Sequence, residues 1–149
     1  MNGGEAAPAA AFADTNMWLY ALLATQDAAK SAEARRLVRD TLLLVSTQLI
    51  NEVCVNLIRK ARFTESQIEE LVGAFYTRHS VVTLDRATLL HASRLRARYQ
   101  LSFWDSMMTA SALAGAARVF YSEDMHHGLL IEDRLRVTNP FHPTQTPAT

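Results

Sequence analysis

The stretch AFADTN, residues 11–16, decides the fold expected for this chain. Its three apolar residues predict a short buried strand, which the polar residues that follow bring to an end before a helix from about residue 17. An acid at such a point has two common roles. Asp14 can cap the helix by accepting a hydrogen bond from an unpaired backbone N–H. It can also lie at the edge of the sheet where α/β proteins usually bind ligands.

Short apolar runs alternate with helical patterns along the rest of the chain. This alternation is typical of βα units, so we expect an α/β fold with a mainly parallel central sheet flanked by helices. Hydroxyl or acidic residues stand where several of the helices are expected to begin. Further strands are predicted at residues 42–45, 81–84 and 119–121, with a final edge strand at 135–137; helices are predicted at 28–40, from Ser46 or Thr47 to 61, from Thr64 to 76, from Asp85 to 99, and from Ser102 onward.

The length of 149 residues indicates one domain, which we expect to span residues 11–142 between loose tails at 1–10 and 143–149. Fifteen basic and fifteen acidic residues give a formal net charge of zero, so overall charge does not indicate a nucleic-acid partner. The single cysteine, Cys54, excludes an internal disulfide and fits a reducing compartment. No signal peptide or run of membrane-spanning length is recognisable, so we expect a cytoplasmic protein without membrane contact.

Three further acids occupy positions comparable to that of Asp14. Glu52 and Asp105 lie in the opening turns of predicted helices, and Asp124 follows the predicted strand at 119–121. Strand ends and helix starts meet at one edge of an α/β sheet, and like charges that meet there repel one another. A divalent cation is the simplest compensation, so the four acids predict a cation site.

Each of these acids also has a plainer interpretation. Asp105 can serve as the partner of a helix dipole, although Trp104 and the apolar helix around it limit its solvation. Glu52 points away from the apolar stripe of its own helix, so it joins a site only if the polar face of that helix lines the groove. In the pair Glu123-Asp124, either acid can be the inward one, and both fit an ordinary turn.

Other motifs are weaker. His126 and His127 can bind metal, but no cysteine or third histidine has the spacing of a zinc site, which favours a solvated loop. No glycine-rich nucleotide loop and no nucleophile elbow occurs. Arg94 and Arg98 can share one helix face, which is solvated by default.

Taken together, the order and surroundings of the acids resemble those of the PIN domain, a metal-dependent ribonuclease fold with three layers. The resemblance covers residues 12–141 and is carried by four motifs in order: Asp14-Thr15-Asn16, Glu52 on a helix, Ser102-x-x-Asp105, and Asp124 after a strand. The chain is similar in particular to bacterial VapC-like proteins, including a late Asn-Pro-Phe at 139–141. It departs from many of them in having Glu123 where they have Asn.

The resemblance implies a ribonuclease that depends on Mg²⁺ or Mn²⁺ and hydrolyses RNA phosphodiester bonds. Asp14, Asp105 and Asp124 would hold the metal, and Glu52 would complete the catalytic set. Supporting roles fall to the residues that would orient ligands or water. These are Asn16, Ser122 and Glu123, with Thr15 acting through its backbone; Arg35, Arg39, Arg94 and Arg98 are candidates for holding the RNA backbone.

VapC-like proteins usually form homodimers and pair with a small antitoxin, so the resemblance also implies the toxin of a toxin–antitoxin pair. A housekeeping or degenerate PIN protein, which binds RNA or a partner without a toxin role, is the alternative. A receiver domain or a dehalogenase-like hydrolase also places an Asp after the first strand. A receiver domain requires a Lys late in the chain, yet no Lys follows Lys60. A dehalogenase-like hydrolase requires a second Asp at the position that Asn16 occupies.

Overall fold

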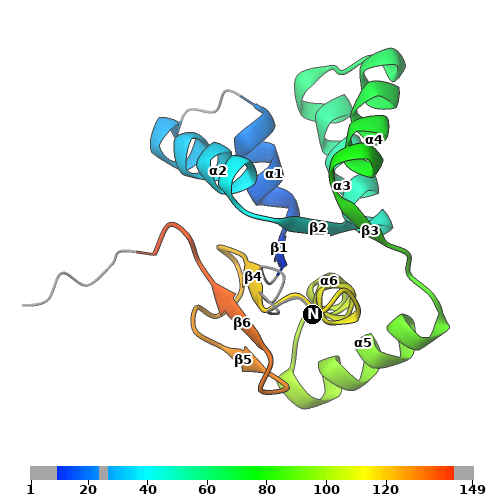
Figure 1. Ribbon diagram of the computed structural model, residues 1–149, viewed down its shortest axis with the longest axis vertical. Coiled ribbons are helices and arrows are strands. Elements are labelled where there is room, and N and C mark those ends of the chain that lie inside the picture. The colour runs from blue at the N-terminus through cyan, green and yellow to red at the C-terminus, as the bar shows by residue number, and fades with distance from the viewer. Residues whose placement is uncertain (1–9, 24–26, 143–149) are drawn as a thin grey trace, which may run out of the picture.

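The computed structural model describes residues 10–23 and 27–142, and within them the chain forms a six-stranded sheet in the order β3-β2-β1-β4-β6-β5 (Figure 1). Neighbouring strands pair in parallel except for β5, which pairs antiparallel with β6. The sheet is therefore mainly parallel, as predicted. Its strands are β1 (Ala11–Ala13), β2 (Leu43–Ser46), β3 (Ser80–Val82), β4 (Val119–Tyr121), β5 (Leu130–Ile131) and β6 (Leu135–Thr138).

Helices cover both faces of this sheet and complete the predicted three-layer α/β arrangement. Helices α1 to α4 lie on one side in Figure 1, and α5 and α6 lie on the other. Helix α6 packs directly on β2 and β3, and α5 packs on α6. The helices are α1 (Thr15–Leu22), α2 (Ala28–Asp40), α3 (Thr47–Ala61), α4 (Glu65–Arg78), α5 (Arg86–Tyr99) and α6 (Phe103–Ala114).

Strand β1 lies at the centre of the sheet because each of its residues is apolar and buried. Strands that are covered on both faces read as continuous apolar runs, whereas half-exposed strands alternate. Phe12 pairs in register with Leu44 on one side and with Phe120 on the other. The rings of Phe12 and Phe120 stack with their centroids 5.3 Å apart. This packing fixes the end of β1, and with it the position of Asp14.

Side-chain caps begin the helices where the sequence predicts them. Asp14, Ser46, Thr64, Asp85 and Ser102 each accept a hydrogen bond from a backbone N–H in the first turn of the helix that follows. Helices α1 and α3 follow β1 and β2 directly, and α6 leads back into β4. The starts of these three helices therefore lie at the carboxyl edge of the sheet, where ligand sites of parallel sheets form.

The last part of the sheet differs from the prediction. The expected edge strand at 135–137 is β6, which lies inside the sheet, because the unpredicted strand β5 pairs with its outer side. A tight turn joins these two strands, and both Glu132 and Asp133 adopt positive φ there (52° and 55°). Strand β5 has only two residues, which is too short for a periodic pattern to indicate it.

The predicted tails at 1–10 and 143–149 lie outside the described residues, apart from Ala10. No helix in the described part of the chain has the length and apolar character needed to cross a membrane.

Candidate active site

A small pocket at the carboxyl edge of the sheet brings the four predicted acids together. Its volume is about 130 Å³. It receives side chains from the end of β1, the start of α1, the second turn of α3, the first turns of α6 and the segment after β4. The lining residues are Asp14, Thr15, Asn16, Glu52, Trp104, Asp105, Met108 and Asp124.

Asp14 is both the cap of helix α1 and an acid of this pocket. Its Oδ1 accepts a hydrogen bond from the backbone N–H of Met17 at 3.2 Å, so the two interpretations of this residue are compatible. The pKa of Asp14 is raised to about 7, chiefly by burial. The charges of Asp124 and Glu123 add to the rise, whereas hydrogen bonds from the hydroxyl of Ser122 and the amide of Met17 oppose it. A carboxylate this deep needs a positive partner to remain ionised.

Glu52 reaches the pocket because the polar face of α3 lines the pocket. The sequence made the role of Glu52 depend on this arrangement and could not decide it. The hydroxyl of Thr15 donates to Glu52 Oε2 at 2.9 Å. The side chain of Thr15, rather than its backbone, therefore positions Glu52. This bond turns a residue that its own helix would leave in solvent toward the end of β1.

Asp105 lies in the first turn of α6, and its N–H donates to the hydroxyl of Ser102 at 3.1 Å. The neighbouring Trp104 also lines the pocket, yet 59% of its surface is exposed. The tryptophan thus stands beside Asp105 as a wall open to solvent, whereas the sequence suggested that it would shield the acid.

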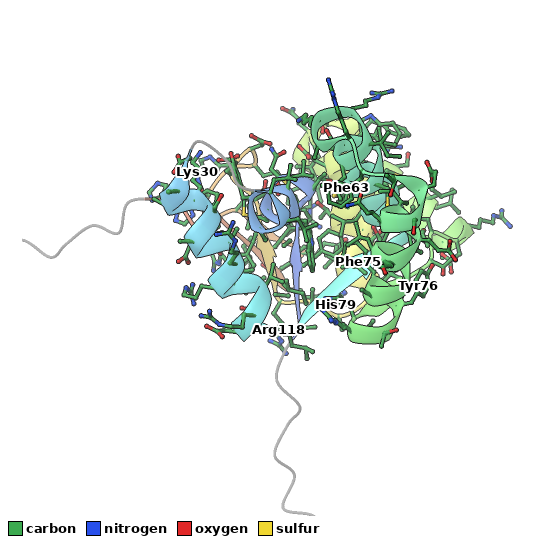
Figure 2. The ribbon with its side chains drawn as sticks, turned by 90° about the horizontal axis from the view of Figure 1, so that it is seen from above. Lys30, Phe63, Phe75, Tyr76, His79 and Arg118 are labelled. Atoms are coloured by element: carbon green, nitrogen blue, oxygen red, sulfur yellow. The ribbon has the colours of Figure 1, made fainter. Side chains whose placement is uncertain are left out.

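The choice between Glu123 and Asp124 is resolved by their contacts. Asp124 lines the pocket and accepts a hydrogen bond from the side-chain amide of Asn16 at 3.2 Å. Glu123 accepts one from the hydroxyl of Tyr20 at 2.6 Å and pairs with Lys30 Nζ at 2.7 Å. Figure 2 shows Lys30 on α2, at the side of the molecule opposite α4. Glu123 is therefore held by α1 and α2, which leaves Asp124 as the acid that faces the pocket.

Ser122 fixes the backbone that carries Asp124. Its side chain is buried, and its hydroxyl oxygen accepts from the N–H groups of Asp124 and Met125, each at 3.2 Å. The same hydroxyl favours the charged form of Asp14. One buried serine thus connects two of the four acids.

The pocket's donor set fits a hard cation. The described residues that line it supply carboxylate, hydroxyl and amide oxygens, and no Lys or Arg compensates their charge. Such all-oxygen sites suit Mg²⁺ and Mn²⁺. Within residues 10–23 and 27–142, however, no three acidic, His or Cys side chains already stand as a metal-coordinating group. The carboxylates therefore line the pocket without forming a ready-made coordination shell.

Gln48 adds an observation on the same helix face, one turn before Glu52. Its side chain is buried, and neither its amide nitrogen nor its oxygen has a hydrogen-bond partner among the described residues. Buried amides are normally hydrogen-bonded, so Gln48, like the indole N–H of Trp18, is an exception among the described side chains.

The four arginines expected to hold RNA do not reach the pocket. Arg35 donates to the carbonyl of Ala21, and Arg39 pairs with Asp40. The guanidinium of Arg98 lies over the ring of its neighbour Tyr99. Arg94 lines a separate pocket of about 340 Å³, together with Ala87, Thr88, His91, Ala114 and Glu132. The structure thus scatters these four side chains and brings none of them to the acids.

The family model of the PIN domain matches residues 11–127, which contain every acid of the pocket. The chain belongs to the PIN domain family. No curated protein matches the chain.

Solved PIN structures share this fold at low sequence identity. A toxin–antitoxin complex from Klebsiella pneumoniae matches with a TM-score of 0.67 and 16% identity, covering 88% of this chain and 98% of the other. VapC20 of Mycobacterium tuberculosis, described as a sarcin-ricin loop cleaving toxin, matches with a TM-score of 0.61 and 17% identity over 76% and 91%. VapBC2 from Rickettsia felis, bound to a DNA fragment from its promoter, matches with a TM-score of 0.59 and 13% identity over 87% and 99%.

Sequence reasoning missed two contributors to this PIN site. The role of the Thr15 hydroxyl depends on how α1 and α3 meet, which no local pattern reports. Met108 reads as one more apolar residue of α6, although it lies one turn after Asp105 on the same helix face, and that spacing could have indicated it.

Proposed function

We propose that this PIN protein is a metal-dependent ribonuclease that hydrolyses phosphodiester bonds in RNA. The observation that carries the proposal is the convergence of four carboxylates from distant parts of the chain in one pocket without a basic residue among its described lining. Burial of Asp14, which raises its pKa, adds to the case for a cation, because an ion would allow this group to ionise.

Asp14, Asp105 and Asp124 would hold Mg²⁺ or Mn²⁺, with Glu52 in support. Such an ion would supply Lewis-acid chemistry, lowering the pKa of water and stabilising charge on the phosphoryl oxygens. The protein's own contribution is positioning. Thr15 orients Glu52, Asn16 orients Asp124, and both contacts come from the first turn of α1.

The cellular role that we propose is that of a toxin controlled by a small antitoxin. The support is the fold shared with the Klebsiella pneumoniae and Rickettsia felis toxin–antitoxin proteins, together with membership of the PIN family. Expression should arrest growth, and co-expression of the partner or the substitution Asp14→Ala should relieve the arrest. Homodimer formation belongs to the same proposal.

The substitution Asp105→Asn tests the activity itself. It keeps the shape of the side chain and the Ser102 cap, so the variant should fold normally but lose metal-dependent cleavage of tRNA and rRNA fragments. Asp133→Asn is the matched control, because this exposed Asp lies in the β5–β6 turn and Asn tolerates its positive φ. Equal cleavage by wild type and Asp105→Asn would refute the proposal. Binding of RNA without cleavage by wild type would instead favour a degenerate PIN protein.

A further inference from the structure

Two adjacent aromatic residues stand exposed at the start of α6. Trp104 is 59% exposed and Phe103 is 52% exposed. Large apolar side chains that group on the surface commonly mark a binding site. The Trp104–Phe103 pair, called the aromatic step below, is therefore a candidate for contact with a ligand.

The aromatic step is held in place from behind. The two rings meet edge to face, with centroids 5.1 Å apart and planes at 82°. The guanidinium of Arg96 lies over the ring of Phe103 at 4.5 Å, and it donates to the hydroxyl of Ser106 at 2.7 Å. Ser106 in turn donates to the backbone carbonyl of Phe103 at 2.6 Å. The step is thus braced by α5 and by its own helix, so a ligand that stacks on it would order few side chains.

The aromatic step is continuous with the acidic pocket, because Trp104 lines that pocket beside Asp105. Any chain whose phosphate lay at the carboxylates would therefore place neighbouring groups against the indole. An aromatic face can stack with any of the four nucleobases, since every base has a π-face. A base within a duplex is stacked on both sides and cannot offer that face.

We propose that the aromatic step is a stacking subsite for one unpaired nucleobase next to the phosphodiester that is cleaved. The inference rests on the proposed ribonuclease function and deepens it by naming the side chains that would hold a base beside the cleaved bond. Arg96 contributes positive charge behind Phe103, as expected of a surface that approaches a polyanion. A protein surface docked on the step is the competing occupant, and the experiment separates the two.

The test is a double-mutant cycle, in which Trp104 and single bases of the RNA are removed separately and together. A labelled short single-stranded RNA of mixed sequence is bound to the Asp105→Asn protein in Mg²⁺, and each nucleotide in turn is replaced by an abasic one. Removal of one particular base should weaken binding about tenfold. In Trp104→Ala the same removal should have no further effect, and Trp104→Phe should retain part of the difference.

Tyr76→Ala is the matched control. Tyr76 is 56% exposed, but it lies at the end of α4, which leads into β3 and so occupies the opposite edge of the sheet. Figure 2 shows it pointing outward from that helix. This variant should keep the full dependence on the base. Tryptophan emission gives a second readout, because Trp18 is 3% exposed and Trp104 is the other tryptophan of the chain.

Equal dependence on the base in Trp104→Ala and in its parent would overturn the proposal. The proposal would also be overturned if Trp104→Ala left RNA binding unchanged and altered only the oligomeric state seen by sedimentation. The aromatic step would then be a contact between proteins. If wild type cleaves RNA but Trp104 and the base show no coupling, the subsite proposal is wrong and the ribonuclease proposal stands. If Trp104 and the base are coupled but no RNA is cleaved, the ribonuclease proposal is wrong and the stacking subsite stands. Failure to bind RNA at all overturns both.

Discussion

The hydroxyl of Thr15 donates to Glu52 Oε2 across 2.9 Å and joins the start of α1 to the second turn of α3. These two helices follow neighbouring strands, so the bond holds two sides of the acidic pocket together. It also explains how an acid from the polar face of an amphipathic helix becomes part of a site.

Thr15→Val should therefore lower both activity and stability. The substitution keeps the shape of the side chain but removes the donor, and loss of one such hydrogen bond costs about 1 kcal/mol in the free energy of unfolding. RNA cleavage should fall more steeply than stability, because Glu52 loses its orientation. Thr15→Ser retains the donor and should behave like wild type in kcat/KM and urea unfolding. A Thr15→Val protein with unchanged cleavage would separate Glu52 from the catalytic set.

The buried carboxyl of Asp14 predicts a pH-dependent stability for the metal-free protein. Its pKa is about 7 in the fold against 3.8 for an unperturbed Asp, so between these values the unfolded chain has released a proton that the folded chain keeps. The free energy of unfolding should consequently fall by about 1.4 kcal/mol per pH unit in this window, and level off above pH 7.

Asp14→Asn isolates this contribution, because Asn caps helices as well as Asp does. In EDTA the difference in Tm between the variant and wild type should grow from pH 4 to pH 7 in favour of the variant. Added Mg²⁺ should raise the Tm of wild type at pH 8, since a ligand of the folded state stabilises it, and leave the variant unmoved. Parallel Tm curves for the two proteins in EDTA would show that Asp14 is ionised throughout.

The pair between Lys30 and Glu123 should support activity through the position of Asp124. Lys30→Met frees Glu123 from α2, so the segment after β4 should hold Asp124 less firmly and cleavage should fall severalfold. Arg36→Met breaks the pair with Glu33 on the exposed side of the same helix and serves as control. Steady-state cleavage of one RNA by both variants is the measurement. A loss of the same size in both would point to α2 as a whole.

Gly115 should resist even a methyl group. A Cβ there would lie 2.7 Å from Leu44 Cδ2 and 3.2 Å from Val82 Cγ2, where α6 ends against β2 and β3. Gly115→Ala should reduce the free energy of unfolding by about 1–2 kcal/mol through overpacking. Gly73→Ala, on the exposed side of α4 with nothing within 4 Å of its Cβ, should instead raise it by up to about 1 kcal/mol. Urea unfolding of both variants checks the opposite signs.

The sequence predicted what local patterns control. The apolar run before Asp14, the Ser102 cap and the buried character of α6 are short-range features, and each is confirmed in the structure. The α/β class followed from their alternation. The burial of β1 on both faces is likewise visible in its three apolar residues.

What remained open depends on contacts between distant elements. Glu52 could not be placed because its periodicity describes α3 alone, while its position is set by Thr15 from another helix. The choice of Asp124 over Glu123 required the partners Tyr20 and Lys30, which lie about a hundred residues earlier in the chain. The distance of the four arginines from the pocket could not be foreseen either, because charge on a helix face does not indicate which edge of the sheet that face approaches. Their role in holding RNA stays a prediction.

The strand order places β1 between β2 and β4, so the pocket is closed by residues from both ends of the domain, and Asn16 contacts Asp124 across 108 positions. During synthesis the ribosome makes Asp14 and Glu52 long before β4, and Asp105 shortly before it. A nascent chain that stops before β4 lacks the fourth acid and the strand that holds Asp14 in register. Premature termination of translation before β4 therefore yields an incomplete acidic pocket, and all four acids are present only once the chain has been extended to residue 124.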